Sequence, residues 1–244
     1  MKRADNTPFN EADYLVKLAG ILVQKNLATF TDLSEHDSNL VSDIISACFD
    51  KNLKILDDIV EAKPSEKTRI YYTLSLLVTN GVITVRQLVM VHKKLGIEIG
   101  KYMLRRDKFV YHQMKESGNH SPESLTYLKK TETYQDLIRI AVNEIIDDIY
   151  ACNFLANLVR KELLDMEGLE LLDYHLGENV KDTLSKKETL KTSMQHSSIH
   201  LNSGLITILV LCFTDLGIEL DDISSAHPQL GSRVGAVLFS KGVI

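Results

Sequence analysis

Residues 65–118 read SEKTRIYYTLSLLVTNGVITVRQLVMVHKKLGIEIGKYMLRRDKFVYHQMKESG and decide how this chain folds. Apolar side chains recur every three or four residues along most of the stretch, which is the period of an amphipathic helix. Ser65 is placed to cap a first helix, and Gly81 supplies the left-handed residue that ends it. Thr84 and Gln87 then form a capping box that starts the next helix. The stretch therefore predicts consecutive helices joined by short turns.

Helical periodicity continues on both sides of this stretch, and the runs of alternating valine and threonine that are typical of strands are scarce. We therefore predict an all-α protein, a multi-helix bundle of about eight helices. Gly96 and Gly118 are expected to follow the ends of two of these helices. The expected helices cover residues 10–26, 38–62, 65–80, 84–95, 97–117, 133–166, 185–216 and 228–240, with a short helix that begins at Pro122.

The most loop-like part of the chain, residues 116–122, suggests a boundary between two packed sub-bundles. The expected division is 1–118 and 119–244, and the chain is also short enough to form a single domain. The helix expected over 133–166 would extend on the order of 50 Å and carries apolar rows at heptad-like spacing. It is expected to form the spine of the second half or part of a dimer seam. No internal repeat with a solenoid period is expected.

The composition is that of an ordinary globular protein, with 44% apolar and 25% charged residues. The net charge of −5 argues against a protein that coats nucleic acid or an anionic membrane through its overall field. The three cysteines form no CxxC pair, so we expect no disulfide framework, no zinc site and a cytoplasmic location. The densest apolar run, residues 205–213, is too short to cross a membrane. We expect no membrane partner, no metal and no cofactor.

A basic island interrupts this acidic chain between Lys93 and Lys115. It contains seven basic residues and only two acidic ones, Glu98 and Asp107. If a polyanion such as RNA binds to the protein, contact is expected in this island because binding depends on the phosphates that are neutralised. The residues expected to bind a polyanion are Lys93, Lys94, Lys101, Arg105, Lys108 and Lys115.

Within the island, Arg106 and Asp107 are followed after four residues by His112. This pattern in a helical setting resembles the short motif of the HEPN superfamily, in which an arginine, a polar residue and a histidine form a ribonuclease site. The resemblance implies a metal-independent endoribonuclease with Arg106, Asp107 and His112 as its catalytic residues. It also implies that such a site usually forms where two protomers meet, each of which donates its arginine and histidine.

The chemistry that the resemblance implies is physically sound. A histidine can exchange a proton with a ribose 2′-hydroxyl near neutral pH, and a guanidinium can stabilise the phosphate as it becomes pentavalent. On an unbroken helix, however, Arg106 and His112 point about 120° apart, whereas Arg105 and His112 share a face. Either the helix is broken near Asp107, or a partner protomer completes the site, or the match is accidental and the segment is a solvated basic face.

Two other patterns have both a functional and an ordinary interpretation. The helices on either side of Gly81 fit a helix-turn-helix that reads DNA, and they equally fit a helical hairpin. His196 and His200 could present two imidazoles to one metal, but Ser197 stands where a metalloprotease motif needs glutamate, and a polar helix face is the alternative. The DNA contacts would come from Arg86, Gln87, His92, Lys93 and Lys94.

Glycine loops that bind phosphate, a serine nucleophile elbow and dinucleotide fingerprints do not occur in the sequence. Their absence favours a non-enzymatic role. We therefore expect a cytoplasmic helical regulatory or protein-interaction protein that associates with itself or with another protein. The alternatives are the HEPN-type endoribonuclease and a helix-turn-helix regulator that binds DNA.

Overall fold

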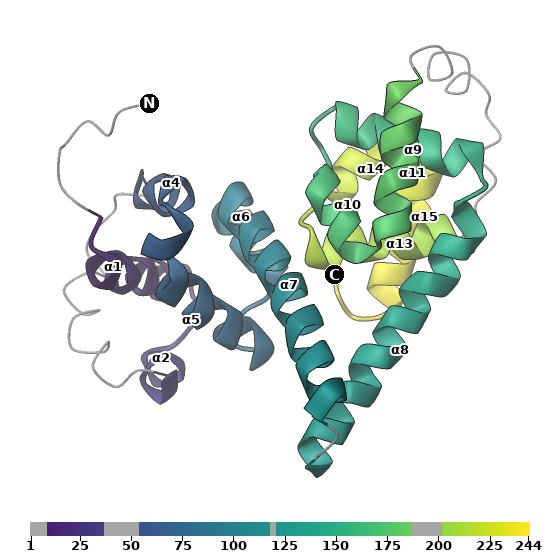
Figure 1. Ribbon diagram of the computed structural model, residues 1–244. Helices are drawn as coiled ribbons and strands as arrows, with labels where there is room; N and C mark the ends of the chain where they lie inside the picture. The colour runs from purple at the N-terminus through teal and green to yellow at the C-terminus, as the bar shows by residue number, and fades with distance from the viewer. Residues whose placement is uncertain (1–8, 37–53, 118–120, 187–201) are drawn as a thin grey trace. The chain divides into compact units, whose positions relative to one another are not determined.

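The computed structural model describes residues 9–36, 54–117, 121–186 and 202–244 of the chain. These residues form thirteen α-helices and one 3-10 turn, and they contain no β-strand (Figure 1). The predicted all-α class is confirmed, but the expected number of helices was too low. The main reason is that several of the expected helices are followed or interrupted by short helices of seven residues.

In chain order the helices are α1 (Glu11–Gln24), α2 (Phe30–His36), α4 (Lys54–Glu61), α5 (Thr68–Thr79), α6 (Val85–Val91), α7 (Lys93–Ser117), α8 (Pro122–Ile145), α9 (Ile149–Arg160), α10 (Met166–Leu172), α11 (Tyr174–Ser185), α13 (Ser203–Asp215), α14 (Leu220–Ala226) and α15 (Pro228–Ser240). Pro64–Glu66 form the 3-10 turn, so α5 begins after it rather than at Ser65. Of the helix expected over 38–62, only α4 lies within the described residues.

The chain divides into two compact units, Met1–Tyr102 and Met103–Ile244. This division falls inside α7, whereas the sequence placed a boundary at the loop that follows it. We call the two parts unit 1 and unit 2 and describe each by itself.

In unit 1, α1 packs against α4 and α5, and the apolar faces of the three helices form the core. An acidic side chain of α1 also supplies the cap that α5 lacks in its own sequence. The Glu11 carboxylate accepts the backbone N–H groups of Arg69, at 2.5 Å, and Ile70, at 3.3 Å. These groups are among the unpaired donors of a helix N-terminus, so the contact fixes the start of α5 on α1.

In unit 2, α8 packs along α13 and α9 packs along α11 around one apolar core. The single helix expected over 133–166 is wrong, because α8 ends at Ile145 and α9 starts at Ile149. The Asp148 carboxylate caps α9 by accepting the N–H groups of Tyr150, at 2.9 Å, and Ala151, at 3.2 Å. Of the apolar row expected to form a spine or a dimer seam, Ile138, Val142, Ile145 and Ala156 are buried in the core of unit 2, whereas Ile149 is 55% exposed.

The helix expected over 185–216 is described only in part. Ser185 ends α11 instead of starting a helix, and α13 begins at Ser203 behind the cap Asn202. The residues 187–201 lie outside the described part of the chain, and they include His196 and His200. The helical conformation expected for the apolar run 205–213 is confirmed, and seven of its nine residues are buried.

One three-helix arrangement occurs three times in the described chain, and we name its copies repeat A (α5, α6 and α7), repeat B (α9, α10 and α11) and repeat C (α13, α14 and α15). In each copy, a residue with positive φ lies two positions after the end of the first helix. It changes the direction of the chain, which then forms a short helix of seven residues. These residues are Gly81, Glu162 and Gly217, with φ of 73°, 58° and 69°. Helices α1 and α2 repeat the first half of the pattern around Asn26, with φ of 55°.

A single extended residue then separates the short helix from the last helix of each repeat. Its side chain accepts the N–H of the leucine three residues later, which caps the last helix. The pairs are His92 Nδ1 with Leu95 at 3.1 Å, Asp173 Oδ1 with Leu176 at 2.9 Å, and His227 Nδ1 with Leu230 at 3.1 Å. The second helix of the hairpin expected at 84–95 thus ends at Val91, before Gly96.

A glycine follows each of these leucines, and it lies against the backbone of the preceding short helix. A Cβ on the glycine would lie 2.6–3.0 Å from the Cα atom of the residue seven positions earlier, closer than real Cβ atoms pack. The three strings are HKKLG at 92–96, DYHLG at 173–177 and HPQLG at 227–231. This recurrence has no solenoid period, in line with the sequence, because the capping residues His92, Asp173 and His227 are 81 and 54 residues apart. The spacing between copies is irregular, so no fixed period marks it.

Candidate functional site

The motif that resembles the HEPN signature lies on α7, which is one continuous helix from Lys93 to Ser117. A helix break near Asp107, one of the three explanations offered by the sequence, is therefore excluded. Arg106 and His112 are six residues apart on this helix and project in different directions. Within one chain they do not form a shared site through helix geometry.

The Arg106 guanidinium is held by its neighbour in sequence. Its Nε and Nη2 atoms donate to Asp107 Oδ1 at 3.3 and 3.2 Å, and the side chain is 23% exposed. The Asp107 backbone carbonyl accepts the hydroxyl of Tyr127 on α8 at 3.5 Å. This part of the motif ties α7 to α8, which is a structural role.

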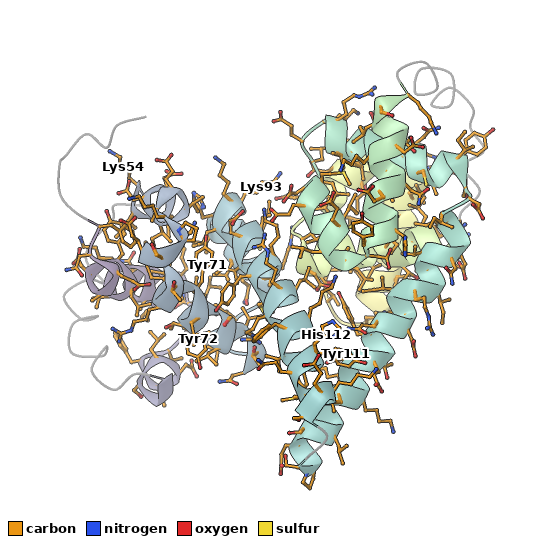
Figure 2. The ribbon with its side chains drawn as sticks, in the orientation of Figure 1. Lys54, Tyr71, Tyr72, Lys93, Tyr111 and His112 are labelled. Atoms are coloured by element: carbon orange, nitrogen blue, oxygen red, sulfur yellow. The ribbon has the colours of Figure 1, made fainter. Side chains whose placement is uncertain are left out.

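His112 is exposed, and its ring meets the ring of Tyr111 edge-on at 5.6 Å between centroids (Figure 2). The Tyr111 hydroxyl donates to Glu132 Oε1 at 3.2 Å and accepts from Lys115 Nζ at 3.2 Å. The hydrogen bond to Tyr111 raises the pKa of Lys115. The histidine imidazole is thus available to solvent, while the polar network beside it fastens α7 to α8.

The basic residues expected to bind a polyanion are divided by the structure. In unit 1, Lys93 and Lys94 are exposed, whereas the Lys101 side chain is buried and pairs with Glu98 at 2.8 Å. An ammonium that is buried and paired in this way presents little positive potential to an external phosphate.

Two basic residues of the island in unit 2, Arg105 and Lys108, face acidic groups of repeat B. Arg105 pairs with Glu167 of α10. Lys108 is half-buried, and burial lowers its pKa while the charge of Asp173 raises it. The local excess of positive charge in the sequence is therefore partly compensated within the folded unit.

Sequence reasoning missed a polar cluster where α8 meets the end of α13. The Tyr134 hydroxyl donates to Asp215 Oδ2 at 2.6 Å. Burial raises the pKa of the Asp215 carboxyl, the hydrogen bonds from Tyr134 and Thr214 oppose this, and the charge of Asp107 adds to the rise. Asp215 is also the last residue of α13, where the helix dipole disfavours a negative charge. The signal in the sequence was an aspartate two residues after the dense apolar run 205–213.

A second polar cluster lies in unit 1 where the start of α5 meets α4. Lys67 Nζ donates to the Val60 carbonyl at 2.8 Å and lies 4.8 Å from the centroid of the Tyr71 ring. Burial lowers the pKa of Lys67 and raises that of Tyr71. No grouping of three or more His, Cys, Asp or Glu side chains that could hold a metal ion occurs in the described ranges.

The helix-turn-helix interpretation places Thr84–Leu95 in a DNA groove, but α6 covers only Val85–Val91, and three of its seven side chains are buried. Gln87 completes the capping box, because its Oε1 accepts the N–H of Thr84 at 2.8 Å. His92 caps α7 and its Nε2 lies 3.1 Å from Asp57 Oδ1. These side chains serve the turn itself, which favours the helical hairpin.

Comparison with known proteins gives no family assignment, because no family model, curated protein or solved structure matches the chain. In the part of the chain that the structure describes, no helix combines the length and apolar character needed to cross a membrane.

Proposed function

We propose that this chain is a helical regulatory or interaction protein that binds other proteins, including a second copy of itself. The threefold recurrence of a helix, a short helix and a capped second helix carries this proposal. Proteins built from stacked helical repeats commonly use surface residues of the repeats for binding, because the core positions are reserved for packing. Buried Cys152 and Cys212 as free thiols fit a reducing cytoplasm.

The recurrence separates constrained positions from variable ones. The capping residue, the leucine and the glycine have the same structural task in all three repeats. The two residues between the cap and the leucine differ in chemistry, being Lys-Lys in repeat A, Tyr-His in repeat B and Pro-Gln in repeat C. Exposed positions that differ in chemistry between the copies are what a set of binding surfaces on one scaffold requires.

Self-association is favoured by an apolar strip on α8. Ile140 is 57% exposed and Leu137 is 40% exposed, although the opposite face of this helix is buried in the core of unit 2. Burial of such side chains in an interface contributes roughly 25 cal/mol for each Å² of apolar surface removed from water.

Light scattering of the purified full-length chain over a concentration series tests this proposal. We expect the mass to rise with concentration, and we expect Ile140→Glu to return the chain to a monomer. Thr126→Glu adds the same charge to an exposed position of the same helix, roughly 20 Å from Ile140 along its axis, and is expected to leave the association intact. A chain that stays monomeric at every concentration and also captures no protein partner would overturn the proposal.

A second candidate function is the metal-independent endoribonuclease of HEPN type. The observation that favours it is the exposure of His112 on the same continuous helix as Arg105 and Arg106. Because one chain does not bring Arg106 and His112 together, this activity requires a second protomer. Cleavage of RNA that disappears in His112→Ala would support it, and RNA that stays intact with the wild-type chain would remove it.

A further inference from the structure

The outward side of α8 carries a row of exposed residues whose spacing alternates between three and four. We call them the outer row of α8: Lys130, Thr133, Leu137, Ile140, Glu144 and Asp147. Residues at this spacing lie on one face of a helix, because three or four residues complete about one turn. Asp147 follows the end of α8, but Ile146 before it keeps helical angles (φ −62°, ψ −33°), so the chain reaches Asp147 along the same helical path. The outer row is therefore one continuous surface of unit 2.

The charges of the outer row are separated along the helix axis. The cation Lys130 stands at the start of the row, the two apolar side chains stand at its centre, and Glu144 and Asp147 stand at its end. Lys130 and Asp147 are exposed and form no ion pair within the described residues. Beside the row, Asp136 and Arg139 pair with each other at 2.8 Å, so their charges largely cancel. A row with an apolar centre and opposite charges at its two ends is complementary to a second copy of itself in one orientation.

Two α8 helices that pack antiparallel around a two-fold axis match both the apolar centre and the charged ends. With the axis between Leu137 and Ile140, each Leu137 faces the second copy's Ile140, and each Lys130 faces the second copy's Asp147. Each contact occurs twice, because a two-fold interface repeats it. A parallel arrangement would instead place Lys130 against Lys130 and Asp147 against Asp147. The antiparallel helices overlap over residues 132–145, about 20 Å of each helix, so the interface is small.

We propose that the outer row of α8 is a homodimer interface in which two copies pack antiparallel, with Lys130 of each copy paired to the second copy's Asp147. This inference rests on the proposed self-association, and it names the orientation of the partner and the charge pairs that select it. The Glu144 carboxylate, which accepts the Ser203 hydroxyl at 2.6 Å, adds negative charge near the same lysine. The apolar centre supplies binding energy when it is buried, whereas the ion pairs fix the orientation and weaken as salt is added.

Sedimentation equilibrium of the full-length chain tests the proposal through charge exchange. Lys130→Glu turns both ion pairs into repulsive pairs, and so does Asp147→Lys, so each variant is expected to raise the dimer Kd about tenfold. An equimolar mixture of the two variants is expected to recover association, because every charge in the mixed dimer again faces its opposite. The chain that carries both substitutions is expected to recover it too. We also expect the Kd of the wild type to rise with sodium chloride concentration.

The mixture also controls for folding and net charge. It contains the same two variants that associate weakly alone, so recovery has to come from the pairing between them. If the mixture does not recover association, the proposal is overturned. A mixture of Lys130→Glu with the wild type tests the parallel arrangement, which would pair the substituted position with Lys130. The proposal is also overturned if this mixture associates more tightly than the mixture of the two variants.

Ile140→Glu separates failure of this inference from failure of the proposed function. If Ile140→Glu abolishes self-association but neither charge variant weakens it, the antiparallel charge pairing is wrong while self-association through α8 stands. A wild-type chain that stays monomeric at every concentration overturns this inference, and capture of another protein would then decide whether the interaction function stands. Thr126 lies outside the overlapping residues, so Thr126→Glu is expected to leave the Kd unchanged.

Discussion

Replacement of Gly231 by alanine probes the close contact between α14 and α15, the last two helices of repeat C. The Cβ of an alanine at this position would lie 2.6 Å from Cα of Ser224. Ser224 belongs to the preceding short helix, and a backbone atom cannot be moved aside by a change of rotamer. The substitution therefore has to separate α14 from α15.

The expected magnitude combines two opposing effects. Overpacking of a tight contact costs about 1–3 kcal/mol, and exchange of glycine for alanine inside a helix returns about 1 kcal/mol. We expect a net loss of up to about 2 kcal/mol in the free energy of unfolding. The matched control is Gly235→Ala in the same helix, where the nearest atom is a Leu220 side-chain methyl at 3.3 Å that can shift.

Thermal unfolding followed by circular dichroism measures both variants. A loss of 1 kcal/mol lowers the Tm of a chain of this size by roughly 2–4 °C. We expect Gly231→Ala to melt several degrees below the wild type and Gly235→Ala to melt at or above it. The reasoning would be refuted if Gly231→Ala were as stable as Gly235→Ala, because the close approach would then carry no energetic weight.

Three further predictions concern caps and buried charge. Asp148→Ala removes the cap of α9 and is expected to cost about 1 kcal/mol in urea unfolding, with an unchanged m-value. His227→Ala is expected to cost a similar amount while His227→Asp is not, because Asp173 already performs this task in repeat B; equal stability of both variants would contradict the role of the cap. Asp215→Asn is expected to raise the Tm at neutral pH. Since the folded-state pKa of Asp215 is raised, folding favours its neutral form, so the wild-type chain loses stability as pH rises above the ordinary carboxyl range, and the advantage of the variant should vanish in acid.

Part of the architecture follows directly from the sequence. The capping box of Thr84 with Gln87 and the left-handed turn at Gly81 occur as predicted, because both depend on residues only a few positions apart. The last helix likewise begins at Pro228 and ends at Ser240. Local chemistry decides these features without help from tertiary packing.

The helix ends that the sequence did not predict, on either side of α9, have no glycine or proline to mark them. Asp148 breaks an apolar pattern that continues through it, and Glu162 adopts positive φ although glycine is the usual residue there. Gly96 was expected to end a helix, but it lies inside α7 and permits a close approach to Val89. The same residue type can end a helix or allow two backbones to touch, and only the packed structure distinguishes these tasks.

The candidate site was less predictable than the fold. The composition of the basic island could be counted, but its effective charge depends on Glu167 and Asp173, which are far away in sequence. Burial of Lys101 against Glu98 likewise depends on how α7 packs in unit 1. The electrostatic potential of a surface depends on the side chains that folding brings next to it. A single sequence does not identify these side chains.

The glycine contact of each repeat joins residues that are only seven positions apart in the chain, as Gly96 and Val89 are. Contacts between near neighbours in sequence close with a small loss of chain entropy, and proteins rich in them fold quickly. The corner between each short helix and the helix after it can thus form as soon as that segment leaves the ribosome. During synthesis, each corner would then fold before the rest of the chain is made. Only the packing of one helix pair against another would require the later residues.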